Sequence, residues 1–200
     1  MNYQEFLESK KKIKETNGID IEVDALNSVL FDYQKAIVKK ALKKKRFCLF
    51  EACGMGKTLQ QLEWAHQVAT FTNKPVLIVA PLGVTAQTAY EEAPLLGYEV
   101  KVLRDSFTID KGLYITNYEQ LENIQTSVLG GVVLDESSIL KNFTGKTRVR
   151  LSKAFENTEY KLCCTATPAP NDLMELLNHA DFLGIMSTAQ ALANYFINDM

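Results

Sequence analysis

The sequence predicts an α/β domain with a mostly parallel β-sheet and helices on both faces. Short apolar runs of strand length, such as Val76–Ala80, alternate with longer segments whose apolar residues recur at helical spacing. These runs lack the polar alternation of half-exposed strands, as expected for strands covered on both faces. The chain has 200 residues, 46% hydrophobic and 23% charged, which is enough for one sizeable core of ordinary globular composition.

The helices and strands of the N-terminal half are predicted from the spacing of apolar residues and from the turn-forming residues between them. A polar, charged helix is predicted over 2–15, and breaker residues with a short alternating stretch occupy 16–24. Further helices are expected at Asp32–Lys45, Lys57–Thr70 and Val84–Leu95, strands at Phe47–Phe50 and Val76–Ala80, and a glycine-containing turn at Glu51–Gly56.

The C-terminal half continues the same alternation. Strands are expected at Tyr98–Leu103, Leu113–Thr116, Val132–Leu134 and Lys161–Cys164, and helices at Thr147–Phe155, Asn171–Phe182 and Thr188–Phe196. No repeat or Pro/Gly-rich linker divides the chain. We therefore expect an N-terminal helical extension over 1–26 and one compact lobe over 27–200.

Charge is distributed unevenly along the chain. The net charge is −2, but residues 1–50 hold 11 Lys and Arg against 7 Asp and Glu. The lysines cluster at 10–14 and 39–46, where they form either a surface for nucleic-acid phosphates or a solvated helix face.

Cysteine spacing argues against a zinc-binding protein, and hydropathy argues against a membrane-spanning one. None of the four cysteines forms a C-x-x-C pair, which argues against a zinc site. Cys163 and Cys164 lie in an apolar run and are predicted to be buried free thiols. No window approaches 18 apolar residues, so we expect no membrane span. The N-terminus lacks the apolar stretch of a signal peptide and the cysteines read as free thiols, so we expect a reducing cytoplasm as the location, that of the bacterial host if the protein is phage-encoded.

A glycine-containing loop joins the strand Phe47–Phe50 to the helix that begins at Lys57. Gly54 and Gly56, on either side of Met55, lack Cβ atoms, so the backbone can curl around a phosphate with its N–H groups pointing inward. The helix adds its positive dipole end. The Lys57 ammonium can reach β- and γ-phosphates, and the Thr58 hydroxyl can hold Mg²⁺. The segment therefore predicts a P-loop, although Glu51 stands where the usual pattern has glycine.

An acidic pair, Asp135-Glu136, follows the apolar run Val132–Leu134. In P-loop NTPases a carboxylate at a strand end holds the Mg²⁺ that bridges the phosphates, and Asp135 is placed for that role. Glu136 is then the general base that polarises the attacking water.

Several segments in fixed order resemble the first RecA-like lobe of superfamily 2 (DEAD/DEAH-like) helicases. The closer resemblance is to the Swi/Snf-type branch of double-stranded-DNA translocases in its phage and bacterial forms. Besides the P-loop and the acidic pair, it is carried by Leu30–Gln34, Val79–Pro81, Ile115–Glu119, Leu140–Asn142, Thr165–Pro168 and Asn171–Leu173. It covers residues from about 27 to 185.

The resemblance implies a DNA-dependent ATP hydrolase of helicase or translocase type with ATP and Mg²⁺ as cofactors and double-stranded DNA as partner. It assigns catalysis to Lys57, Asp135 and Glu136, metal binding to Thr58 and Asp135, and coupling to Thr165 and Thr167. Gln34 would read the adenine edge. Residues 54–58 would hold the nucleotide, and nucleic acid would contact Pro81, Thr116, Asn117, Lys141 and Asn142.

Alternatives to these assignments remain open. Gln34 could be an exposed helix residue, and the segments after Ala80 and Ile115 could be ordinary loops. Ser137-Ser138 replaces the family's usual Ala-His, which bears on coupling to the second lobe. The whole chain could instead be a nucleotide-dependent interaction module without motor activity, or a DNA-binding domain.

The second RecA-like lobe of the family has no counterpart in the 200 residues. That lobe supplies the arginine finger, which is worth about 10³–10⁵ in rate. We therefore expect the isolated chain to hydrolyse ATP very slowly, and we expect the natural protein to continue for a further lobe.

Overall fold

A computed structural model describes residues 18–104, 109–141 and 145–195. Within them a single sheet has the strand order β1-β6-β5-β2-β4-β3, and every neighbouring pair is parallel. The expected fold class is confirmed. The strands are β1 (Arg46–Phe50), β2 (Val76–Ala80), β3 (Val100–Val102), β4 (Leu113–Asn117), β5 (Gly131–Asp135) and β6 (Tyr160–Thr165).

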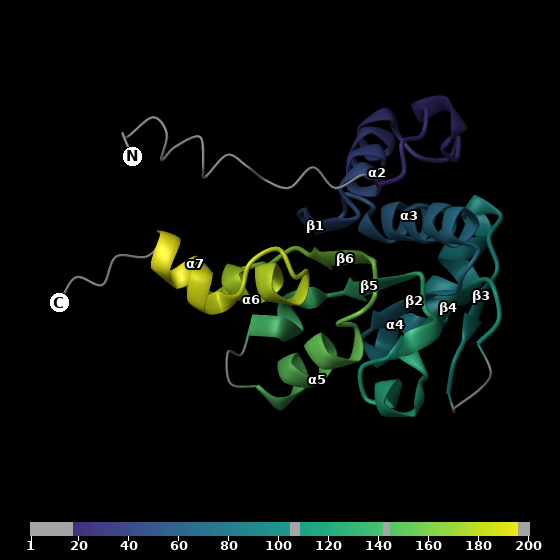
Figure 1. The fold of residues 1–200 in the computed structure, drawn as a ribbon. Coiled ribbons are helices and arrows are strands. Elements are labelled where there is room, and N and C mark those ends of the chain that lie inside the picture. Colours follow the sequence, from purple (N-terminus) through teal and green to yellow (C-terminus); the bar gives the residue numbers. More distant parts are fainter. Residues whose placement is uncertain (1–17, 105–108, 142–144, 196–200) are drawn as a thin grey trace.

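Helices cover both faces of this sheet, as Figure 1 shows for α3 on one side and α5 and α6 on the other. The α-helices are α2 (Asp32–Lys44), α3 (Lys57–Thr72), α4 (Leu82–Gln87), α5 (Lys146–Ala154), α6 (Glu175–Phe182) and α7 (Thr188–Tyr195). Short helical turns are η1 (Val23–Ala25), η2 (Thr88–Glu92), η3 (Ala93–Leu96), η4 (Gln120–Asn123), η5 (Thr126–Val128) and η6 (Ser137–Lys141).

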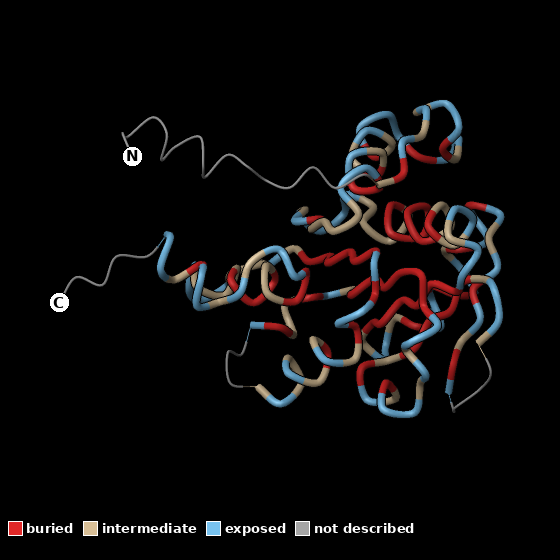
Figure 2. The backbone as a smooth tube through the Cα atoms, in the orientation of Figure 1, coloured by how far each residue is buried: buried red, intermediate tan, exposed pale blue. Residues whose placement is uncertain are grey.

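The core has two halves separated by the sheet. Along β2, Val76, Ile78 and Ala80 join the cluster under α2 and α3, whereas Leu77 and Val79 join the cluster with α5 and α6. The central strands are accordingly the most deeply buried part of the chain (Figure 2). Because side chains alternate across a strand, this is what an all-apolar central strand requires.

Two predicted helices are shorter or less regular than expected. Val84–Leu95 is divided into α4, a π-helical turn and a 3₁₀ turn, where Pro94 lacks the N–H that would continue an α-helix. The helix expected from Asn171 begins at Glu175, because the Asp172 carboxylate accepts the Met174 N–H in a turn before it.

Other expectations have different outcomes. The helix predicted over 2–15 lies outside the described residues, and the alternating stretch before residue 25 ends in the 3₁₀ turn η1. Cys163 and Cys164 are buried free thiols, as predicted, and burial raises the pKa of both. Among the helices in the described ranges, none is both long and apolar enough to cross a bilayer.

A buried carboxylate on α3 connects the segment before α2 with the segment before β3 through hydrogen bonds. Glu63 of α3 is fully buried, and its carboxylate accepts the Asn27 N–H, the Gln67 amide and, at 2.5 Å, the Tyr98 hydroxyl. Burial raises the pKa of Tyr98, so the hydroxyl keeps its proton and remains a donor.

We expect Tyr98→Phe to lower the free energy of unfolding by about 2 kcal/mol, because one oxygen of a buried carboxylate loses its donor. Thermal unfolding should shift down by roughly 4–8 °C for a domain of this size. Tyr90→Phe, which removes the same hydroxyl from a ring that is 65% exposed, is the control and should change little. Equal shifts in the two variants would show that the Glu63 contact does not stabilise the fold.

Candidate nucleotide-binding site

The polar residues singled out by the sequence meet at the carboxyl edge of the sheet. In the parallel register Phe50 pairs with Thr165 and Asp135 pairs with Cys164. The loop after β1, the acidic pair after β5 and the threonine at the end of β6 therefore lie side by side. Ligands of open α/β sheets bind at this edge.

The loop over 51–56 has the backbone that its glycines predict. Gly54 and Gly56 adopt φ angles of +83° and +73°, which are costly for residues with a Cβ atom. A Cβ added at Gly54 would meet nothing within 4 Å, so open space adjoins the loop there. α3 follows for 16 residues and starts at Lys57. The arrangement is a phosphate cradle with a helix N-terminus beside it.

Lys57 and Glu51 are both engaged within this loop. The Lys57 ammonium donates to the backbone carbonyls of Glu51 and Ala52 at 2.9 and 3.0 Å. The Glu51 carboxylate accepts from the Gln60 amide at 2.7 Å, which joins the loop to the first turn of α3. Glu51 thus stabilises the loop from the position where the usual pattern has glycine.

Gln34 is not an exposed helix residue, so that alternative is wrong. It is 2% exposed and donates through Nε2 to the Met55 carbonyl at 3.0 Å. The Tyr33 hydroxyl donates to the same carbonyl. A Cβ on Gly56 would approach Gln34 Nε2 to 2.3 Å, so glycine is needed for this contact. The start of α2 is therefore packed on the loop, and adenine recognition by Gln34 stays a prediction.

Asp135 lies partly buried at the end of β5 and faces α3. Its Oδ1 accepts from Gln61 Nε2 at 3.2 Å. Burial raises the pKa of Asp135, the Gln61 hydrogen bond opposes that shift, and the charge of Glu136 adds to it. The Tyr118 hydroxyl holds the Asp135 backbone carbonyl at 2.6 Å.

Glu136 is exposed and has a φ of +53°, a left-handed conformation that is uncommon for residues other than glycine. Its Oε1 accepts hydrogen bonds from the hydroxyls of Ser138 and Thr165, both at 2.7 Å. Thr165 Oγ1 also accepts the Thr167 N–H at 3.0 Å. The acidic pair and the Thr165–Pro168 segment are thus connected directly through the Glu136 carboxylate.

Sequence reasoning missed several residues that build this edge. Gln60 and Gln61 of α3 are fully buried, and no apolar spacing along the chain distinguished them from exposed helix residues. His179 of α6 is 2% exposed and contacts Ser137 Oγ through Nε2 at 3.1 Å. Burial lowers the pKa of His179. No pattern along the chain pointed to that pair.

The predicted nucleic-acid contacts are less uniform. Thr116 is 1% exposed and its hydroxyl donates to the Leu103 carbonyl, so this side chain lies in the core, and a contact of nucleic acid with its backbone stays a prediction. Asn117 ends β4 and its side-chain oxygen accepts the backbone N–H groups of residues 119 and 120. Pro81 precedes α4 and Lys141 is exposed, whereas Asn142 lies outside the described residues.

Comparisons with known proteins agree with this architecture. The family model described as "SNF2-related domain" matches residues 33–198. No curated protein matches the chain.

Solved structures resemble the chain at low sequence identity. The SWI2/SNF2 ATPase core of Sulfolobus solfataricus in complex with dsDNA has a TM-score of 0.75 at 20% identity, over 89% of this chain and 41% of that one. The UvsW helicase of bacteriophage T4 has a TM-score of 0.59 at 18% identity, over 94% of this chain and 66% of that one. The Hef helicase domain of Pyrococcus furiosus has a TM-score of 0.63 at 20% identity, over 76% of this chain and 36% of that one. The chain thus spans about two fifths of the SWI2/SNF2 core.

Proposed function

Because the chain belongs to the SNF2-related domain family, we propose that it is the ATP-binding first lobe of a DNA-dependent ATPase that translocates on double-stranded DNA. Within the chain, we place the start of this lobe near residue 27, after the N-terminal extension. The observation that carries the proposal is the meeting of the glycine loop, the start of α3 and the pair Asp135-Glu136 at one edge of the sheet.

The chain's own residues divide the work of binding and orienting ATP. The loop amides of residues 54–58 would cradle the phosphates, and the Lys57 ammonium, which here donates to the Glu51 and Ala52 carbonyls, would bind the β- and γ-phosphates. The Thr58 hydroxyl and the Asp135 carboxylate would hold Mg²⁺, since both are the oxygen ligands that this ion prefers. When bound, Mg²⁺ supplies positive charge against the phosphate oxygens.

Glu136 accepts a proton from the attacking water as general base. The hydroxyls of Ser138 and Thr165 keep its carboxylate at the end of β6. Through Thr165 and Thr167, the same contact would report the state of the nucleotide to a second lobe. Pro81, Asn117 and Lys141 are the proposed contacts with the DNA backbone.

We expect the chain to bind ATP weakly, with an affinity that Mg²⁺ raises. The Mg²⁺ contribution requires the charged form of Asp135. Because burial raises the pKa of Asp135, acidification should remove this contribution at a higher pH than an ordinary aspartate would allow. Calorimetric titration with ATP, with and without Mg²⁺ over a pH series, measures both effects, and Asp135→Asn is expected to lose the Mg²⁺ contribution at every pH.

DNA binding and turnover are tested separately. Titration with a labelled duplex should show binding, and hydrolysis by the chain alone should stay very slow with or without DNA. Absence of ATP binding in the presence of Mg²⁺ would overturn the proposal. Robust DNA-stimulated turnover by the 200 residues would contradict the assignment of an essential group to a second lobe.

A further inference from the structure

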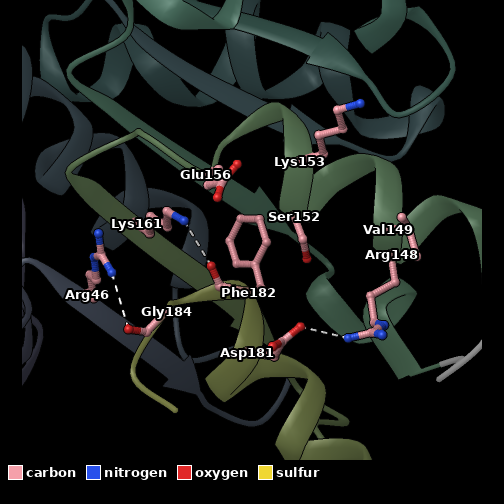
Figure 3. A pocket seen from close by; sticks show the side chains of 10 residues that line it. All are labelled: Arg46, Arg148, Val149, Ser152, Lys153, Glu156, Lys161, Asp181, Phe182 and Gly184. Carbon is pink, nitrogen blue, oxygen red and sulfur yellow. Dashed lines mark hydrogen bonds and ion pairs between the residues drawn. The ribbon is translucent and has the colours of Figure 1, made fainter. Parts of the chain in front are cut away.

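A cavity lies at the opposite edge of the sheet from the glycine loop. It is bounded by the beginnings of β1 and β6, by α5 and by the end of α6, and its volume is about 480 Å³ (Figure 3). Arg46 is the first residue of β1 and Lys161 the second of β6, whereas Phe50 and Thr165 end these strands beside the candidate nucleotide site. The cavity is therefore separate from that site.

The charges around the cavity are predominantly positive. Four cations and two carboxylates line it, namely Arg46, Arg148, Lys153, Lys161, Glu156 and Asp181. Arg148 and Asp181, which both line it, form an ion pair at 2.8 Å (Figure 3). The other three cations form no ion pair with a residue of the described ranges. An excess of positive charge thus remains inside a concave surface.

Lys161 is the most unusual of these cations. It is 3% exposed, and its ammonium makes one hydrogen bond within the described part of the chain, to the Phe182 carbonyl at 3.0 Å. The ammonium also lies 5.1 Å from the centre of the Phe182 ring, and its three donors are not all taken by the single hydrogen bond. Burial, together with the charge of Arg46, lowers the pKa of Lys161 to about 8. The charges of Glu156 and Asp181 oppose this shift only in part, so an anion bound directly to the ammonium would further offset the cost of burying it.

Neighbouring groups are placed to complete an anion site. Arg46 Nη1 is fixed by the Leu183 carbonyl at 2.8 Å, which orients the guanidinium at the cavity wall. The Ser152 hydroxyl is buried with no hydrogen-bond partner in the described residues. The exposed Lys153 stands on the next position of α5. Guanidinium, ammonium and hydroxyl donors around one cavity are the groups that proteins use to bind phosphate.

We propose that this cavity binds the phosphate group of a small phosphorylated ligand. A volume of about 480 Å³ is that of a small-molecule site. Val149 and the Phe182 ring provide apolar surface for the remainder of the molecule. The inference does not depend on the proposed ATPase function.

The test uses the whole chain carrying Lys57→Ala, which weakens phosphate binding at the glycine loop. Phenyl phosphate, inorganic phosphate and a short DNA duplex are titrated by NMR, with the Lys161 ammonium and the α5 amides as reporters. We expect saturable binding of phenyl phosphate, weaker binding of inorganic phosphate, and an upward shift of the Lys161 pKa in the bound state, since an anion stabilises the charged form.

Substitutions locate the site. Lys161→Met and Lys153→Gln should each weaken phenyl phosphate binding about tenfold, because each removes a charge-assisted contact. Lys101→Gln, on β3 at the far end of the sheet, is the matched control and should leave it unchanged. Lys161 also holds the end of α6, so the Lys161→Met chain could fail to fold. In that case the binding affinity of Lys153→Gln, a substitution at an exposed residue, tests the site.

Three outcomes would overturn the inference. They are the absence of saturable binding in the Lys57→Ala chain, binding that Lys153→Gln leaves intact, and binding of the duplex without binding of either small phosphate. The last would make the cavity a nucleic-acid contact instead.

Discussion

Lys57→Ala is expected to weaken ATP binding by about 10–100-fold, which corresponds to losing one charged donor to the phosphates. In the free chain the Lys57 ammonium bonds only to the carbonyls of Glu51 and Ala52 among the described residues. Its removal should therefore leave the fold intact. Calorimetric titration with Mg²⁺ and ATP measures the affinity, and thermal unfolding checks the fold.

The matched control for this substitution is Lys74→Ala. Lys74 is an exposed lysine just beyond the opposite end of α3, where the helix dipole and the loop have no influence on a bound phosphate. Its substitution should not change ATP affinity, and neither variant should lose affinity for duplex DNA. If Lys57→Ala binds ATP as well as the unmodified chain, the glycine loop is not the phosphate site.

Glu136→Gln is expected to slow ATP hydrolysis by at least about 100-fold while ATP binding persists, since an amide cannot take a proton from water. Glutamine has the same shape and can still accept hydrogen bonds from Ser138 and Thr165, so the left-handed turn at this position should be preserved. Because turnover by the chain is expected to be slow, single-turnover hydrolysis with protein in excess over radiolabelled ATP is the appropriate measurement.

Two further variants define what this result means. Glu119→Gln, at an exposed glutamate after β4, should hydrolyse ATP at the unmodified rate. Ser138→Ala removes one of the two hydroxyl donors to Glu136 and should reduce the rate only several-fold. Hydrolysis that is unaffected by Glu136→Gln would assign the general base to another residue.

The strand and helix pattern was readable because it depends on local periodicity. The strand Val76–Ala80 was predicted with its observed bounds, since an all-apolar run flanked by proline is distinctive, whereas the bounds of the other strands differ by one or two residues. The division of Val84–Leu95 into an α-helix, a π turn and a 3₁₀ turn was not predicted, because a single π turn leaves the spacing of apolar residues nearly unchanged.

The candidate site was predictable to the extent that its residues follow strand ends. The ends of parallel strands meet at one edge, so the glycine loop and Asp135-Glu136 had to lie at the same edge once the sheet was parallel, and the strand order then decided how close they are. The burial of Thr116 could not be predicted in the same way. Helices cover both faces of β4, so its side chains stay buried as far as Thr116 and exposure begins only at Asn117.

The sequence by itself determined the fold class, the phosphate-loop pattern and the family resemblance, because each is written in residues close together along the chain. Only the tertiary structure decided which side chains complete the edge: Gln61 on Asp135, Ser138 and Thr165 on Glu136, and His179 on Ser137. It also brought Arg46 and Lys161 to α5 at the other edge. Most of these partners are distant in sequence, and packing of helices on the sheet fixes the distances between them.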